Sequence, residues 1–106
     1  MTASLPSAAV FAALGDDTRL RLVSRMCDMG PASIVGLTEG SGVTRQAVTK
    51  HLRILEGAGL VQTARVGRET RWQVLPGGFD DARARLDEIS AQWNDALGRL
   101  KAFVED

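Results

Sequence analysis

The chain has 106 residues, the size of one domain, and its 44% hydrophobic and 25% charged residues are typical of a soluble globular protein. No apolar run approaches the roughly 20 residues that span a bilayer, and the N-terminal stretch lacks the basic region of a secretory signal. A single cysteine, Cys27, excludes an internal disulfide framework. We therefore expect one cytoplasmic domain over residues 1–106, without membrane insertion.

The net charge is zero, but the charges are unevenly distributed along the chain. Residues 41–75 carry six Lys and Arg against two Glu, a balance of +4, whereas residues 1–40 carry −1 and residues 76–106 carry −3. A positive field confined to one segment is typical of a surface that binds an anionic partner such as nucleic acid.

The first two expected elements are helices. Residues 7–14 are apolar and Ala-rich, and Ser7 is the expected N-cap. Asp16 is the expected N-cap of a helix over about 17–29. We expect the buried side of this helix to be formed by Leu20, Val23 and Cys27, with Leu22 and Met26 beside them. Three arginines should then point mostly outward: Arg19, Arg21 and Arg25.

A short helix is expected next, over 34–39, capped by Ser33 and burying Ile34 and Leu37. The glycine-containing turn Gly40-Ser41-Gly42 then leads into the following helix. Two helices joined by such a turn form the helix-turn-helix pattern.

The helix within Val43 to Ala58 has two distinct faces. Thr44 is its expected N-cap, and Gly57 and Gly59 are its expected stop signals. Its apolar face consists of Val48, Leu52 and Leu55, and its opposite face of Gln46, Thr49, Lys50 and Arg53, with Arg45 at the edge. Cations, an amide and a hydroxyl on one face suit a helix set into the major groove of DNA. The alternative is an ordinary amphipathic helix with a solvated face.

A β-hairpin is predicted directly after this helix, because the hydrophobic period changes to two. Its strands are residues 60–65 and 69–74, and Thr70, Trp72 and Val74 share one face. Arg65 and Arg68 fall at its tip, where they can reach phosphates or the minor groove. The alternative is that the tip is basic only for solubility.

One long helix is predicted over 79–104, where apolar residues recur every three or four positions. Its length of about 39 Å exceeds what so small a domain covers with its own core. We expect it to pack, with the 7–14 helix, against a second copy; the alternative is that it lies across its own domain. The expected interface residues are Val10, Phe11, Leu86, Ile89, Trp93, Leu97 and Leu100.

The order of elements and three stretches resemble the ArsR/SmtB family of winged-helix bacterial repressors. These stretches are FAALGDDTRLRLV, VTRQAVTKHLRILEGAGLV and RVGRETRWQV. The tail AQWNDALGRLKAFVED is most similar to the branch of small autorepressors related to SdpR.

The resemblance implies a mainly α fold with a small β-hairpin, a winged helix-turn-helix in the order α-α-α-α-β-β-α. It implies that the segment 41–75 holds the recognition helix and wing, and that the first helix and the last, over 79–104, form a two-fold dimer. The DNA contacts would be Arg45, Gln46, Thr49, Lys50 and Arg53, with the wing residues Arg65 and Arg68. His51 would either support the helix, which we favour, or bond a phosphate.

The metal-sensing sites of the family are not matched by this chain. The thiolate pair of its arsenic and lead/cadmium sensors would fall at Ser33 and Val35, and the tail has no histidine for a zinc site. We expect no metal and no cofactor, since one Cys and one His cannot supply a tetrahedral set. Cys27 is expected to be a small buried hydrophobe, with thiol sensing as the alternative.

The function we expect is a homodimeric, sequence-specific repressor that occludes a promoter at an inverted-repeat operator in double-stranded DNA. The alternative is a winged-helix protein-interaction module that does not bind DNA. We do not expect an enzyme, because no catalytic motif is present in the sequence. Release could come from a small apolar ligand between the tail helices, a membrane-bound partner or dilution. Trp93 is expected in the interface core rather than in a ligand site.

Overall fold

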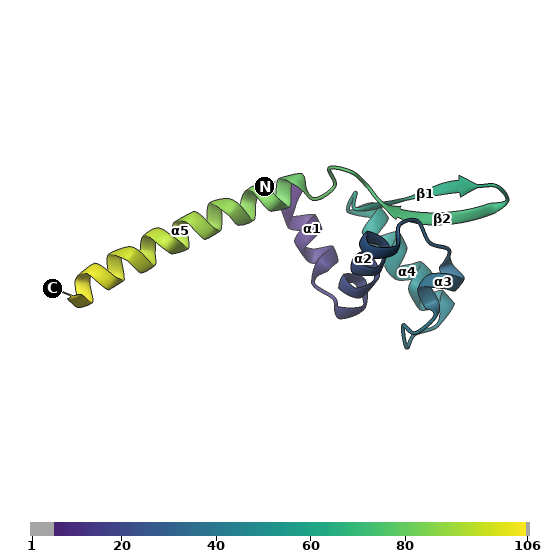
Figure 1. Cartoon of the computed structure of the whole chain (residues 1–106), viewed down its shortest axis with the longest axis horizontal. Helices are drawn as coiled ribbons and strands as arrows, with labels where there is room; N and C mark the ends of the chain where they lie inside the picture. Colours follow the sequence, from purple (N-terminus) through teal and green to yellow (C-terminus); the bar gives the residue numbers. More distant parts are fainter. Residues whose placement is uncertain (1–5, 106) are drawn as a thin grey trace, which may run out of the picture.

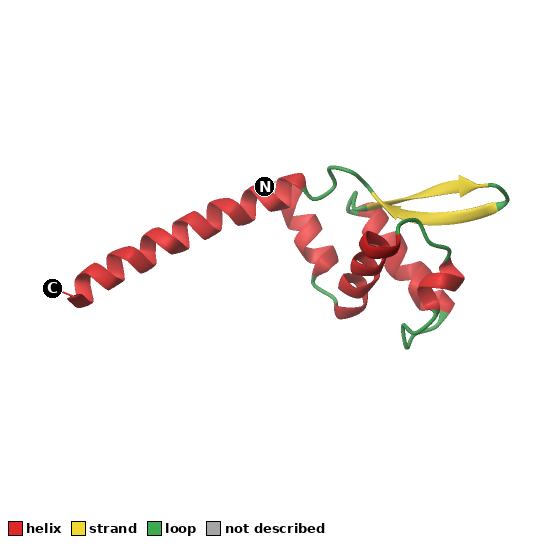
Figure 2. Ribbon diagram, viewed as in Figure 1, coloured by secondary structure: helices red, strands yellow, loops and turns green. Residues whose placement is uncertain are grey.

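The computed structural model describes residues 6–105, which form five helices and one antiparallel two-stranded hairpin (Figures 1 and 2). The predicted fold class is confirmed, and each element begins and ends within two residues of its expected place. The elements are α1 (Pro6–Leu14), α2 (Asp17–Met29), α3 (Ile34–Thr38), α4 (Arg45–Gly57), β1 (Val61–Val66), β2 (Glu69–Val74) and α5 (Asp80–Glu105).

Side-chain caps set the start of three helices as predicted. Asp16 accepts a hydrogen bond from the Arg19 backbone N–H at 3.0 Å, and Thr44 accepts one from Ala47 at 3.1 Å. Ser33 does the same for the N–H of Gly36 at 3.1 Å. The expected Ser7 cap is wrong, because α1 already includes Pro6, whose missing N–H suits the first helical position. Ser7 is instead buried in the first turn.

The hydrophobic core lies where α1, α2, α4 and the base of the hairpin meet. The inner side of α4 is its most deeply buried part, since Val48, Leu52 and Leu55 are each 0% exposed. The remaining buried members of the cluster are Val10, Ala13, Leu22, Val23, Met26, Ala32, Leu37, Leu60, Val61, Trp72 and Ala82. Because one face of α4 is fixed so firmly, its opposite face is held toward solvent.

The hairpin is anchored at its base and projects freely at its tip (Figure 1). Trp72 lies opposite Thr63 in the ladder and also pairs with Ala32, through N–H···O bonds of 2.9 and 2.7 Å. This bridge ties β2 to the segment between α2 and α3. Thr70, on the predicted Trp72 face, is exposed because it lies beyond the body of the molecule.

The buried side of α2 differs from the prediction. Leu22, Val23 and Met26 are buried, whereas Leu20 is 50% exposed and Cys27 is exposed. The expectation that Cys27 is a small buried hydrophobe is therefore wrong. Compared with the predicted orientation, the helix is rotated so that Arg19 and Arg25 turn partly inward. Hydrogen bonds of their guanidinium groups stabilise both side chains there.

Helix α5 extends away from the rest of the molecule, along the longest dimension of 66 Å (Figure 1). Its first turns pack against α1, and Ala82 is its buried residue. The alternative that this helix lies across its own domain is wrong. No helix among residues 6–105 is long and apolar enough to cross a membrane.

Candidate nucleic-acid interface

The exposed face of α4 carries the polar residues singled out from the sequence. Arg45, Gln46, Lys50 and Arg53 are exposed and Thr49 is half-buried. The Thr49 hydroxyl donates to the Arg45 carbonyl one turn earlier, at 2.9 Å. Its oxygen keeps lone pairs for an outside donor, whereas its proton is already used by the helix.

The carboxylates of the basic segment are both paired within the molecule. Glu56 bonds Arg53 at 3.0 Å, and Glu69 bonds Arg71 at 3.0 Å. Among residues 6–105, no ion pair involves the other four cations of the segment, which are Arg45, Lys50, Arg65 and Arg68. The balance of +4 therefore corresponds to four exposed cations on α4 and the hairpin tip.

Arg53 joins α4 to the hairpin. Its guanidinium carbon lies 5.2 Å from the centroid of the Trp72 ring, within the range of a cation–π interaction. The side chain is nevertheless 63% exposed. Arg53 can therefore support the β2 strand and still present N–H donors to solvent, a double role that its place on the helical wheel did not indicate.

The hairpin tip holds the two arginines predicted there. Arg65 lies opposite Thr70 in the ladder, and Arg68 is in the turn after Gly67, whose φ of 65° favours glycine. Both arginines are exposed. They lie on the hairpin, which projects at the end of the molecule opposite the free end of α5 (Figure 1).

His51 contacts residues at the start of α2, which favours the interpretation that it supports the helix. Its ring Nδ1 lies 3.1 Å from a guanidinium nitrogen of Arg19 and 3.9 Å from the Asp16 carboxylate. Arg19 also donates from Nε to the carbonyl of Ala13. The backbone N–H of Arg19 is the main cause that lowers the pKa of Asp16 below its ordinary value. Together, Asp16, Arg19 and His51 link the start of α2 to the inner edge of α4.

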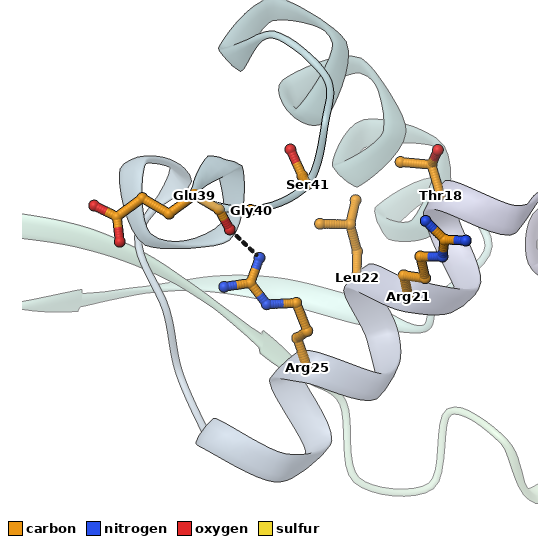
Figure 3. Close-up of a pocket in the computed structure, with 7 residues that line it drawn as sticks. All are labelled: Thr18, Arg21, Leu22, Arg25, Glu39, Gly40 and Ser41. Atoms are coloured by element: carbon orange, nitrogen blue, oxygen red, sulfur yellow. Dashed lines mark hydrogen bonds between the residues drawn. The ribbon is translucent and has the colours of Figure 1, made fainter.

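A pocket of about 310 Å³ lies between α2 and the turn that precedes α4 (Figure 3). Its lining residues are Thr18, Arg21, Leu22, Arg25, Glu39, Gly40 and Ser41. Arg25 reaches across it to the carbonyl of Glu39 at 2.9 Å. This contact could not be predicted from the sequence, because the partner is a backbone oxygen with no sequence signal.

Most of the expected dimer-interface residues form an exposed apolar stripe on α5. Leu86, Ile89, Trp93, Leu97 and Leu100 are between 38% and 62% exposed. Phe11 is half-buried. Val10 is only 5% exposed, so it packs in the core of its own chain and has little area left for a partner. A shallow hollow of about 260 Å³ lies on the stripe, lined by Ile89, Gln92, Trp93 and Ala96.

The described part of the chain contains no group of three or more His, Cys, Asp or Glu placed to hold a metal ion. Ser33, at one position of the expected thiolate pair, caps α3, and Val35, at the other, is 47% exposed.

Known proteins include relatives of this chain. Residues 16–63, which run from the start of α2 into β1, match the model of the arsR family of bacterial regulatory proteins. The HTH-type transcriptional regulator Rv2034 of Mycobacterium tuberculosis is 35% identical over 93 residues, which are 88% of this chain and 83% of that protein.

Solved structures extend the similarity to the whole fold. An ArsR-like transcriptional regulator from Rhodococcus sp. RHA1 superposes with a TM-score of 0.75 at 35% identity, covering 92% of each chain. A second structure is the homodimeric winged helix-turn-helix DNA-binding domain Mb0332 of Mycobacterium bovis. The superposition has a TM-score of 0.63 and covers 89% of this chain and 83% of that one. Because the two sequences are 18% identical, this similarity shows the fold alone.

Proposed function

The chain belongs to the arsR family of bacterial regulatory proteins, and from that membership we propose that it is a homodimeric transcriptional regulator that represses by binding an inverted-repeat operator. The observation that carries the proposal is the arrangement of α4. Its apolar face is fully buried, and its opposite face is exposed and carries cations, as does the hairpin tip, while the two carboxylates of this segment are paired with arginines.

In this proposal α4 enters the major groove and the hairpin follows the flanking backbone. Gln46 and Arg45 read base edges, because amide and guanidinium groups match the acceptors of adenine and guanine. The Thr49 hydroxyl oxygen accepts a hydrogen bond from a base amino group, since its proton is already donated to the backbone carbonyl of Arg45. The remaining cations bind phosphates and supply affinity that depends on salt: Lys50, Arg53, Arg65 and Arg68.

The second copy packs on the apolar stripe of α5. Trp93 and Leu97 are 62% and 52% exposed, which leaves a large apolar area in contact with water. Pairing two such helices through the same stripe removes this area from solvent. Trp93 then lies in the interface core. Phe11 lies at the edge of that interface, whereas Val10 supports it from within the chain.

Occlusion of a promoter needs no catalysis, so no enzymatic step is assigned to this chain. Its target is double-stranded DNA in the cytoplasm. The tail similarity to the SdpR-related branch supports control by something other than a metal. The hollow beside Trp93 is the place where a small apolar effector would be recognised, if release is by a ligand.

The proposal is tested by selection from a random-sequence duplex library with the full chain. We expect an inverted repeat whose half-sites are about 10 bp apart, or a multiple of that, as a two-fold pair of recognition helices requires. Enrichment of a single unrepeated site would contradict the dimeric arrangement. Enrichment of nothing would contradict specific DNA recognition and favour a protein-interaction module.

A further inference from the structure

The end of α3 and the α3–α4 turn are hydrogen-bonded to α2 through one side chain. Arg25, on the last turns of α2, donates to the carbonyls of Leu37 at 2.7 Å, Glu39 at 2.9 Å and Gly36 at 3.0 Å. Among the described residues, every hydrogen bond from α2 to residues 36–44 comes from Arg25. Figure 3 shows its guanidinium directed at the turn.

Helix α3 needs this support, because it is too short to stabilise its own end. It has five residues, one of which is Gly36, a poor helix former. The carbonyls at a helix C-terminus have no partner within the helix, and a cation placed there also interacts favourably with the helix dipole. One planar guanidinium with several N–H donors satisfies three such carbonyls at once.

Packing does not replace these hydrogen bonds. The pocket of about 310 Å³, lined in part by Leu22, lies on this side of the turn, so the space between the turn and α2 is only partly filled by apolar side chains. The turn itself contains two glycines with positive φ, Gly40 at 73° and Gly42 at 77°, and glycine allows many backbone conformations. Ser41 ties the turn to itself through the carbonyl of Thr38, but not to α2.

We propose that Arg25 is a positioning residue for operator recognition. By fixing the end of α3 and the turn, it holds the N-terminal end of α4, ahead of the buried Val48, Leu52 and Leu55, and therefore the position of Arg45 and Gln46 against the bases. The proposal rests on the proposed DNA-binding function. Arg25 itself contacts no DNA in this account, because its guanidinium is occupied by the three carbonyls.

The test compares Arg25→Met, Arg25→Lys and Arg21→Met for binding to the selected operator and to scrambled DNA. Arg21 is the matched control: it lies one turn earlier on α2, loses the same charge, and is paired only with Asp17 on the surface. We expect Arg25→Met to lower the operator-to-scrambled affinity ratio by roughly tenfold, about the factor that one charge-assisted hydrogen bond represents in an equilibrium constant.

Three further readouts separate positioning from loss of charge or of folding. Arg21→Met should leave the ratio unchanged, Arg25→Lys should restore part of it, and the salt slope of Arg25→Met should equal that of the wild type. Equal ratios for Arg25→Met and wild type, or an equal fall in Arg21→Met, would overturn the proposal. If Arg25→Met does not fold, the ratio of the Arg25→Lys variant decides, and it should lie below that of the wild type.

Amide hydrogen exchange in the free protein tests the positioning separately from DNA binding. The amides of Glu39, Ser41 and Val43 should exchange faster in Arg25→Met than in wild type, while those of Leu52 and Leu55 keep their protection. If the wild type fails to prefer any DNA but this exchange pattern holds, the proposed function is wrong, whereas the role of Arg25 in holding the turn stands. Unchanged exchange at the turn overturns that role.

Discussion

The guanidinium carbon of Arg53 lies 5.2 Å from the ring centroid of Trp72, so the recognition-type helix and the second strand of the hairpin are joined by a residue that is also exposed to solvent. Trp72 is buried, and its backbone pairs with that of Ala32. Through Trp72 the orientation of α4 is therefore coupled to the hairpin and to the segment between α2 and α3.

Arg53→Ala should affect both stability and DNA binding. Loss of the cation–π contact should lower the free energy of unfolding by about 0.5–1 kcal/mol, and loss of the phosphate contact should weaken operator and scrambled DNA alike. Thermal unfolding and fluorescence anisotropy measure the two effects. Lys50→Ala is the control: Lys50 is exposed and unpaired among the described residues, so its replacement should weaken DNA binding and leave the unfolding free energy unchanged.

Gln46→Ala and Arg68→Ala should separate base reading from phosphate binding. Gln46→Ala should change the ranking of single-base operator variants by about 1–3 kcal/mol at one position. Arg68→Ala should leave the ranking as it is and reduce the slope of log K against log salt by about 0.9. Anisotropy titrations at several salt concentrations distinguish the two. A slope change in Gln46→Ala, or a changed ranking in Arg68→Ala, would contradict this division of roles.

The helix boundaries could be predicted because their signals are local. Asp16, Ser33 and Thr44 each accept a hydrogen bond from a backbone N–H three residues later, which is a property of the sequence itself. The polar face of α4 was predictable for the same reason, since periodicity alone places its apolar side in the core.

The inward arginines could not be predicted, because their partners come from other elements. Arg19 bonds Ala13 and His51, and Arg25 bonds carbonyls of α3. A periodicity argument treats every arginine as outward, and it therefore assigned α2 a buried side that included Leu20 and Cys27, both of which are exposed. The link from Arg53 to Trp72 was missed in the same way.

Leu97→Asp should separate the proposed dimer into monomers. Leu97 is 52% exposed on the α5 stripe. Since burial of one Leu side chain contributes about 1.5–3 kcal/mol, the loss at two symmetric positions should raise the dimer dissociation constant roughly 100-fold or more. Sedimentation equilibrium measures this constant. Ala91→Asp, which introduces the same charge on the opposite face of α5, should leave the dimer intact; dissociation of both variants would contradict the stripe as the interface.

Stability at low pH should depend on Asp16. Its pKa is below the ordinary value of 3.8, chiefly because its carboxylate accepts the Arg19 N–H, so the folded chain binds this proton more weakly than the unfolded chain. The stabilisation is complete above the unfolded value and is lost as the pH falls through the folded one. Asp16→Asn keeps an N-cap but removes the titration. Its thermal midpoint should therefore fall less between pH 5 and about pH 3 than that of the wild type; equal falls would contradict the role of Asp16.

We infer that α4 and the hairpin together bind a specific DNA sequence, and an anisotropy titration of the selected operator against a scrambled duplex of the same length and composition tests this inference. One dimer should bind the operator roughly 10³-fold or more tightly than the scrambled duplex near physiological salt. The slope of log K against log salt should be about −0.9 for each phosphate contacted. Equal, weak binding to both duplexes would contradict this inference.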